Sequence, residues 1–304
     1  MPMATDDPSE MTGTAIRTLA ASAGLTLDDG PIRVNEMGLD FRVAIARDTA
    51  GQDWVLRIPR RPDATARARD EALTLRLVAP HLTPAVPDWR ISRPDLIAYP
   101  LLSGEPGLTL DDDGTPVWHL DTASLRYARS LGDFLAELHG IDPAEAAGAG
   151  VRTRSPAEVR QAWRTDIDRV VAEFEVAPGL RDRWGAWLGE DSYWPQWSVL
   201  THGEVYPAHT LVVDERITAV LDWTTAAVDD PARDFAFHHA SAPPQAFAVT
   251  LQRYTERGGR VWPRLAEHCA ELISASPVAY GVFALDTGTE EHRQAAAAQL
   301  NPAG

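Results

Sequence analysis

The sequence predicts an α+β fold with two lobes, a small β-rich N-terminal lobe followed by a larger, mainly helical C-terminal lobe. Runs of β-branched and aromatic residues are concentrated in the first hundred residues, and helical periodicity dominates after them. The stretch SGEPG at 103–107 breaks both patterns and is typical of a connector. The 304 residues are long for one compact domain. We therefore expect lobes at 1–102 and 103–304, with a cleft between them.

The first lobe is predicted to combine two helices with a hairpin. An amphipathic segment at Thr14–Ala23 ends at Gly24, which suits a left-handed cap. Phe41–Ala46 and Asp53–Ile58 are rich in β-branched and aromatic residues and flank the turn-like DTAGQ. Apolar residues at helical spacing then continue to Pro80. Two further strands are expected in VPDWRIS and DLIAYPLL.

The second lobe is predicted to be helical around a short β-rich insertion. An apolar face from Leu125 to Leu138 indicates a helix that closes at Gly140. A capping box at Ser155–Glu158 starts the next helix. Short strands are expected at 198–200, 210–213 and 218–221, and helices resume at Asp234.

Composition narrows the class of protein and its partners. The 28 basic residues are outnumbered by 44 acidic ones, giving a net charge of −16, which disfavours nucleic acid and anionic membranes as partners. A single cysteine, Cys269, excludes an internal disulfide framework and fits a reducing compartment. Neither a signal-peptide pattern nor an apolar run of the ~20 residues that span a bilayer is present. We expect a cytoplasmic, monomeric protein that binds small molecules.

Potential chemistry is concentrated in the segment VLTHGEVYPAHTLVVDERITAVLDWTTAAVDDPARD at 199–234. A polar loop carries His202, Glu204 and His209, and the second of the two strands that follow ends at Asp222. A hairpin between these strands would bring Asp222 back beside the loop. A carboxylate that orients a hydroxyl, with metal ligands nearby, is the arrangement that phosphoryl transfer requires.

This segment resembles the catalytic core of aminoglycoside and macrolide phosphotransferases, which have a protein-kinase-like fold. Macrolide 2′-phosphotransferases carry a loop like HGDLxPxH, similar to HGEVYPAH here, and an IDWTEA…DP…D stretch, similar to DWTTAAVDDPARD. NEMGLDFRVAIA and WVLRIPRRP resemble the nucleotide loop and third strand of that family. The resemblance covers roughly residues 33 to 240, and its motifs together are specific.

The resemblance implies roles for individual residues. Glu204 would be the catalytic base beside His202, which either braces the loop or takes part in the chemistry. His209 and Asp222 would hold Mg²⁺, and Asp234 would support the loop structurally. The donor would be GTP or ATP. Arg57 would stand at the position of the phosphate-pairing lysine, with Glu71 on the following helix as its partner. The residues that would bind this nucleotide in the first lobe are Gly38, Arg57, Glu71, Tyr99, Leu101 and Leu102.

Glu204 is a departure from the family, which has aspartate at this position. The extra methylene moves the carboxylate by about 1 Å, and a misplacement of that size can cost roughly a hundredfold in rate. We expect an active natural variant, although a weakened enzyme or a nucleotide-binding pseudokinase also fits the residues. A kinase of another small alcohol, such as an aminoglycoside, choline or homoserine, is the alternative in the same class.

An acceptor site is expected in the second lobe, apolar for a lactone ring and acidic for an amino sugar. Asp229 and Asp230 would meet the cationic amine, although they also fit a solvated acidic turn. The predicted wall lies in the helical region after Asp234 and comprises Phe235, His238, Tyr280 and Phe283.

Overall fold

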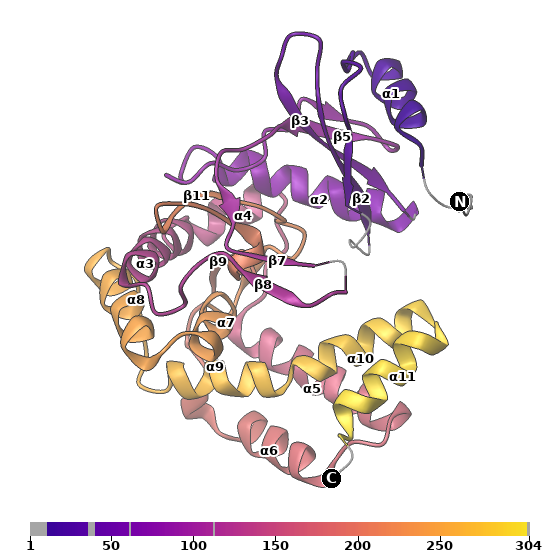
Figure 1. The fold of residues 1–304 in the computed structure, drawn as a ribbon. Coiled ribbons are helices and arrows are strands. Elements are labelled where there is room, and N and C mark those ends of the chain that lie inside the picture. The colour runs from indigo at the N-terminus through magenta and orange to yellow at the C-terminus, as the bar shows by residue number, and fades with distance from the viewer. Residues whose placement is uncertain (1–10, 36–39, 61, 112, 303–304) are drawn as a thin grey trace.

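The computed structural model describes residues 11–35, 40–60, 62–111 and 113–302. It has the two lobes that the sequence predicts, a small antiparallel sheet with two helices above a larger helical lobe (Figure 1). Within the described residues, no helix is long and apolar enough to cross a membrane.

The N-terminal lobe is built on one five-stranded antiparallel sheet. The predicted hairpin is confirmed, because Phe41 pairs with Pro59 and Arg47 with Asp53 across a turn that includes Gly51 at φ +88°. The strand order is β1-β2-β3-β5-β4. The strands are β1 (Arg33–Asn35), β2 (Phe41–Arg47), β3 (Asp53–Pro59), β4 (Ile91–Ser92) and β5 (Ile97–Pro100).

Alternation along β3 divides the side chains between the two faces of this sheet. Leu56 and Ile58 pack with Ile16 and Ala20 of α1 (Gly13–Ser22), which covers the outer face. Val55 packs on the opposite face with a cluster that includes Phe41 and Tyr99. Arg57, two residues after Val55, follows it to this inner face, beside α2 (Pro62–Val78). The strand pattern therefore directs the only cation in the middle of β3 towards the second lobe.

The C-terminal lobe packs its helices around one large core. Its fully buried side chains include Phe134, Trp184, Trp187, Trp223 and Phe235. The predicted capping box at Ser155 and Glu158 is present. The helices are α3 (Leu125–His139), α4 (Pro143–Gly148), α5 (Pro156–Glu173), α6 (Pro178–Gly189), α7 (Arg233–Ser241), α8 (Pro244–Glu256), α9 (Leu265–Ser274), α10 (Ser276–Thr287) and α11 (Glu290–Leu300).

Short strands position the polar loop within this lobe. β9 (Val199–Thr201) leads into the loop, and the 3-10 turn η2 (Pro207–His209) leads out of it into β10 (Thr210–Val213). β10 pairs with β11 (Arg216–Val220), as expected, and on its other edge with β6 (Glu105–Pro106). β12 (Ala227–Asp229) pairs with β9, although the sequence indicated only an acidic loop there. Three residues are too few for a strand pattern to be recognised.

A second hairpin that the sequence did not indicate follows the connector. In it, β7 (Leu108–Leu110) pairs with β8 (Pro116–Trp118). A Cβ at Gly107 would come within 2.9 Å of Leu120 and 3.1 Å of Pro207, so the start of the hairpin lies directly against η2. The hairpin is therefore a neighbour of the polar loop.

Candidate active site

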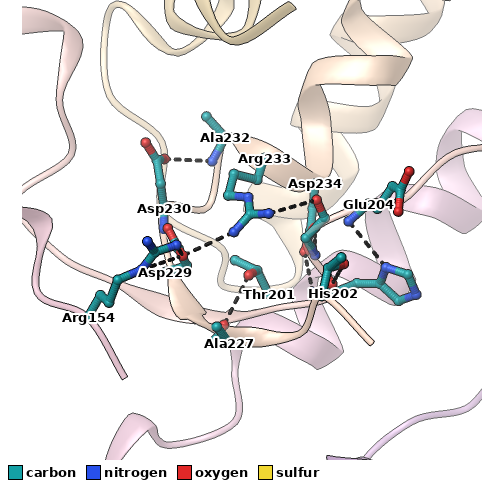
Figure 2. A network of polar contacts seen from close by, with 12 residues as sticks. Arg154, Thr201, His202, Glu204, Ala227, Asp229, Asp230, Ala232, Arg233 and Asp234 are labelled. Carbon is teal, nitrogen blue, oxygen red and sulfur yellow. Dashed lines mark hydrogen bonds and ion pairs between the residues drawn. The ribbon is translucent and has the colours of Figure 1, made fainter. Parts of the chain in front are cut away.

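The polar loop is held from below by the carboxylate of Asp234, the second residue of α7. Its Oδ2 accepts from the His202 amide at 2.9 Å and lies 3.1 Å from His139 Nε2. Its Oδ1 accepts from the Gly203 amide at 2.6 Å. Burial would raise the pKa of Asp234, but the hydrogen bond and charge of His139 and these loop contacts hold it below its ordinary value. Asp234 therefore stays ionised and fixes the start of the loop (Figure 2).

His202 is fully buried, and both of its ring nitrogens are used within the protein. Nε2 donates to the Leu221 carbonyl at 2.8 Å, and Nδ1 accepts from the Glu204 amide at 3.3 Å. Burial lowers the pKa of His202 to about 4, so the ring is neutral near pH 7. Of the two roles that the sequence leaves open for His202, this placement favours the first, in which the ring braces the loop.

Glu204 lies at the exposed side of the loop, and Figure 2 shows its carboxylate on the far side of Asp234 from Arg154 and Asp229. The surrounding residues still remove water from the carboxyl group, and this desolvation raises its pKa. His209 opposes that rise, and the negative charge of Asp222 adds to it. A carboxylate with a raised pKa and access to solvent is suited to accept a proton from a bound hydroxyl.

His209 and Asp222 face each other as the sequence predicts, with Nε2 3.7 Å from Oδ2. The amide of Leu221 donates to the His209 carbonyl at 2.8 Å, which joins the end of the loop to the residue before Asp222. His209 Nδ1 donates to the Glu204 carbonyl at 3.0 Å, because a carbonyl can only accept. In the neutral ring, the lone pair of Nε2 is therefore directed towards the Asp222 carboxylate.

Asp222 has an unusual backbone conformation, with φ +57°, in the left-handed region that L residues rarely adopt. Thr224 Oγ1 donates to its Oδ1 at 2.5 Å. Burial alone would raise the pKa of Asp222, but His209, Arg57 and this hydrogen bond hold it below the ordinary value. The strained position therefore presents an ionised and partly exposed carboxylate beside His209.

Arg57 and Glu71 form the buried ion pair that the sequence predicts, with Nη1 2.7 Å from Oε1. The guanidinium lies 4.3 Å from the ring centroid of Phe41. The second oxygen of Glu71, Oε2, is buried and has no hydrogen-bond partner. The chain contains no lysine, since all of its 28 basic residues are arginine. Arg57 is thus the cation available on β3 for a phosphate group.

The other residues predicted to bind nucleotide lie in or beyond β5. Tyr99 is buried on the inner face of the sheet, and the Leu101 amide donates to the Asp53 carbonyl at 2.8 Å. Leu102 is half-buried at the passage to the second lobe. Gly38 lies outside the described residues.

The expectation that Asp229 and Asp230 line an acceptor site is wrong in this structure, because both carboxylates are buried and paired. Asp229 contacts Arg154 and lies 3.1 Å from Arg233 Nη1. Asp230 Oδ2 lies 2.6 Å from His268 Nε2, and its Oδ1 accepts from the Ala232 amide. These residues hold β12 and the start of α7 to the rest of the lobe (Figure 2).

The predicted acceptor wall is divided between the core and the surface. Phe235 is fully buried beside His139 and Tyr254. His238 is also buried, and its Nε2 lies 2.9 Å from Thr250 Oγ1, but it lines a small pocket together with Tyr206 and Phe237. Tyr280 and Phe283 are half-buried on α10, where they stack on each other at 6.0 Å and contact His292 of α11.

A row of aromatic rings that the sequence did not indicate leads outwards from His209. Tyr206 lies 4.4 Å from His209 and 5.2 Å from Phe237, both measured between ring centroids. Phe237 stacks at 6.5 Å on Trp118 of β8, which is 43% exposed. Leu110 and Val117 of the same hairpin are also exposed. The position of Tyr206, two residues after Glu204, was the one signal in the sequence that could have indicated this row.

The donor set fits a metal that arrives with a nucleotide. No group of three or more His, Cys, Asp or Glu side chains in the described part of the chain could enclose a metal ion by itself. His209 and Asp222 instead offer two ligand atoms at a partly open site, with Nδ1 of the histidine fixed by a backbone carbonyl as in many ligating histidines. Mg²⁺ commonly takes few protein ligands and completes its shell with phosphate oxygens and water.

Comparisons with known proteins agree with this geometry. Residues 31–268 match the family described as "Phosphotransferase enzyme family". The crystal structure of the apoenzyme of a macrolide 2′-phosphotransferase, MphH from Brachybacterium faecium, is 62% identical, with a TM-score of 0.91 over 96% of this chain and 98% of that one. A type I macrolide 2′-phosphotransferase is 42% identical, with a TM-score of 0.89 over 95% of this chain and 98% of that one.

Two further comparisons extend the range of similarity. The uncharacterized protein YcbJ of Bacillus subtilis (strain 168) is 41% identical over 92% of each chain. The GDP complex of aminoglycoside 2′-phosphotransferase-IIIa shares only the fold, at 17% identity and a TM-score of 0.74 over 95% of this chain and 96% of that one.

Proposed function

Because the chain belongs to the phosphotransferase enzyme family and is a small-molecule kinase, we propose that it phosphorylates the 2′-hydroxyl of a macrolide amino sugar. The observation that carries this proposal is the convergence of Glu204, His209 and Asp222 at one open edge of the second lobe. The identities of 62% and 42% to macrolide 2′-phosphotransferases support the acceptor class. The phosphoryl donor is GTP or ATP, and the product would confer antibiotic resistance.

The chain's own residues would perform the transfer in one displacement. Glu204 accepts a hydrogen bond from the acceptor hydroxyl and takes its proton as the oxygen attacks the γ-phosphorus. The new O–P bond forms while the bond from the γ-phosphorus to the β,γ-bridging oxygen breaks, and the electron pair leaves with the nucleoside diphosphate. Arg57 pairs with the donor phosphates, and Glu71 keeps the guanidinium in place.

His209 and Asp222 would hold Mg²⁺ at the edge of the donor site. When bound, the metal supplies positive charge that offsets the charge of the phosphates. Both side chains are already oriented within the protein, since Thr224 donates to Asp222 and the Glu204 carbonyl accepts from the His209 ring. His202 and Asp234 hydrogen-bond to amides of the same loop from the interior. These contacts fix the backbone that carries Glu204 and His209.

The aromatic row from Tyr206 to Trp118 would form the apolar side of the acceptor site. A macrolide ring has a large apolar surface, and Trp118, Leu110 and Val117 are exposed on a hairpin that lies against η2. The negative charges of Glu204 and Asp222 lie at the inner end of the row, where a cationic amino group beside the reacting hydroxyl would be favoured. Tyr280 and Phe283 of α10 form a second aromatic surface that could contact the same ligand.

The proposal is tested by detecting phosphorylated product by mass spectrometry. The protein is incubated with Mg²⁺ and with erythromycin or related macrolides, using GTP and ATP in separate reactions, and kanamycin serves as the control acceptor. We expect macrolides to gain the mass of one phosphoryl group in a metal-dependent reaction. Phosphorylated kanamycin without phosphorylated macrolide would instead indicate an aminoglycoside kinase. Nucleotide binding with no product from any acceptor would indicate a pseudokinase.

A further inference from the structure

A cavity lies in the C-terminal lobe away from the acceptor surface. It has a volume of about 640 Å³ and runs between α3 and α8, with Thr83, Pro84 and the start of β11 at its rim. Figure 1 shows α3 and α8 at the edge of the lobe opposite α10 and α11. None of its lining residues belongs to the polar loop or to the Arg57–Glu71 pair.

Positive charge dominates the lining of this cavity, hereafter the α3–α8 groove. Five arginines line it, whereas only two lining residues, Asp133 and Glu137, are carboxylates. The chain as a whole has 44 acidic residues against 28 basic ones. A groove with the opposite balance is therefore a local exception to the charge of the molecule. The five arginines are Arg126, Arg129, Arg216, Arg253 and Arg257.

Both carboxylates in the groove are already bound to other groups. Asp133 Oδ1 lies 2.8 Å from Arg253 Nε and 3.2 Å from Arg257 Nε. The two oxygens of Glu137 accept from the amide and the hydroxyl of Thr83, at 2.7 Å and 2.8 Å. The acidic residues thus neutralise the α8 side of the groove and the turn at Thr83.

The remaining three arginines, Arg126, Arg129 and Arg216, are exposed and have no side-chain partner among the described residues. Arg126 and Arg129 are three residues apart on α3, a spacing that places side chains about 5–6 Å apart on one helix face. Arg216 enters from β11, beside Ser130, whose Oγ accepts from the Ile217 amide at 3.0 Å and still has its own proton to donate. Three exposed arginines thus line the same groove, and none of them forms an ion pair among the described residues.

We propose that the α3–α8 groove binds a small anion that carries two or more linked phosphate groups. Guanidinium groups bind phosphate oxygens through paired hydrogen bonds, and the three unpaired arginines offer such pairs from two walls of the groove. The volume is larger than one oxyanion requires and is in the range of small-molecule sites. The inference is independent of the acceptor and of the donor of the kinase reaction.

Calorimetric titration with inorganic pyrophosphate, without metal, tests the proposal. The groove variant carries Arg126→Gln, Arg129→Gln and Arg216→Gln. The control variant carries Arg69→Gln, Arg76→Gln and Arg181→Gln, which removes the same charge from exposed arginines outside the groove. We expect the groove variant to bind at least about tenfold more weakly than wild type and the control to change by less than about twofold. Any second pyrophosphate site at Arg57 would persist equally in both variants.

A chemical footprint locates the bound anion. Phenylglyoxal modifies exposed arginines, and pyrophosphate should protect Arg126, Arg129 and Arg216 selectively, as measured by peptide mass spectrometry. Absence of binding by wild type, an equal loss in the control variant, or protection confined to exposed arginines outside the groove would each overturn the proposal. Thermal melting of both variants checks that the exposed substitutions leave the fold intact.

Discussion

His209 Nε2 and Asp222 Oδ2 lie 3.7 Å apart, at the two ends of a β hairpin whose strands separate these residues by thirteen positions in the sequence. The His209 ring is oriented by the Glu204 carbonyl, so its free lone pair is directed at a carboxylate. When the ring is neutral, a cation placed between these two groups would meet one ligand atom from each of them. The pair therefore has the electrostatics of a metal site.

Removing the imidazole should weaken metal use more than nucleotide binding. We expect His209→Ala to raise the Mg²⁺ concentration for half-maximal turnover by about tenfold or more, and His209→Asn to recover much of this loss because its amide oxygen is a ligand that Mg²⁺ accepts. The measurement is the rate against Mg²⁺ concentration at saturating nucleotide. Identical metal dependence in wild type and His209→Ala would remove His209 from the metal site.

Replacing Glu204 tests its role as the base. Glu204→Gln keeps the shape of the side chain and should lower kcat on the order of 10² to 10⁴-fold, and Glu204→Asp should differ from wild type by up to about a hundredfold. Desolvation raises the pKa of Glu204, and the base acts as the carboxylate. Turnover should therefore fall as the pH drops through a pKa above the ordinary value of about 4.3, and this acid limb should be absent from Glu204→Gln. A limb that persists in the glutamine variant would belong to another group.

Arg57 can be tested by a lysine that the chain otherwise lacks. Arg57→Lys preserves the charge beside Glu71 but loses the planar contact with Phe41, so the nucleotide KM should rise while activity is retained. A nucleotide acyl-phosphate probe should acylate this variant at position 57 and leave wild type unlabelled on side chains, since wild type contains no lysine. Excess GTP should suppress the labelling.

Arg57→Met should lower the free energy of unfolding by about 3–5 kcal/mol, because it leaves Glu71 buried without a partner.

The buried His202 should make the protein less stable in acid. Its pKa falls from about 6.5 in the unfolded chain to about 4 in the folded protein, so acid protonates the unfolded state first. Stability from this group is complete above pH ~6.5 and declines as the pH falls towards ~4, by on the order of 3 kcal/mol. Denaturant unfolding of wild type and His202→Gln at several pH values measures this difference. If His202 contributes nothing, the free energy of unfolding should change with pH equally in the two proteins over this window.

Trp118 should affect the binding of the acceptor and leave the binding of the nucleotide unchanged. We expect Trp118→Ala to raise the macrolide KM several-fold, because an exposed aromatic contact would be lost, while the nucleotide KM stays unchanged. Val261→Ala, at a residue of similar exposure outside the hairpin, serves as the control. An equal effect on both substrates would show that the hairpin supports the loop and does not contact the acceptor.

The sequence predicted the site most accurately where neighbouring residues determine the geometry. Asp222 returns to His209 because two short strands joined by a tight turn must pair, and the Arg57–Glu71 pair follows from a strand and the helix after it. Asp229 and Asp230 were placed wrongly because their partners are distant: Arg154 is 75 residues from Asp229, and His268 is 38 residues from Asp230. A run of carboxylates has the same appearance in a sequence whether water or an arginine surrounds it.

The β7–β8 hairpin was missed for a different reason. Its strands have three residues each, and acidic residues dominate the composition of the sequence between them. The stacking of Trp118 on Phe237 joins residues 119 positions apart, and no local pattern predicts such a contact. The surface next to the loop therefore became visible only in three dimensions.

The polar network around Asp234 has a consequence for how this protein can change. It ties His139 at the end of α3, the loop amides and the first turn of α7 into one buried unit, whereas β7–β8 and the aromatic pair on α10 lie outside it. Substitutions in the hairpin can therefore accumulate with little cost to the phosphoryl-transfer machinery. A change of acceptor can therefore begin at the surface of this lobe, while the loop that carries Glu204 and His209 stays held from its interior.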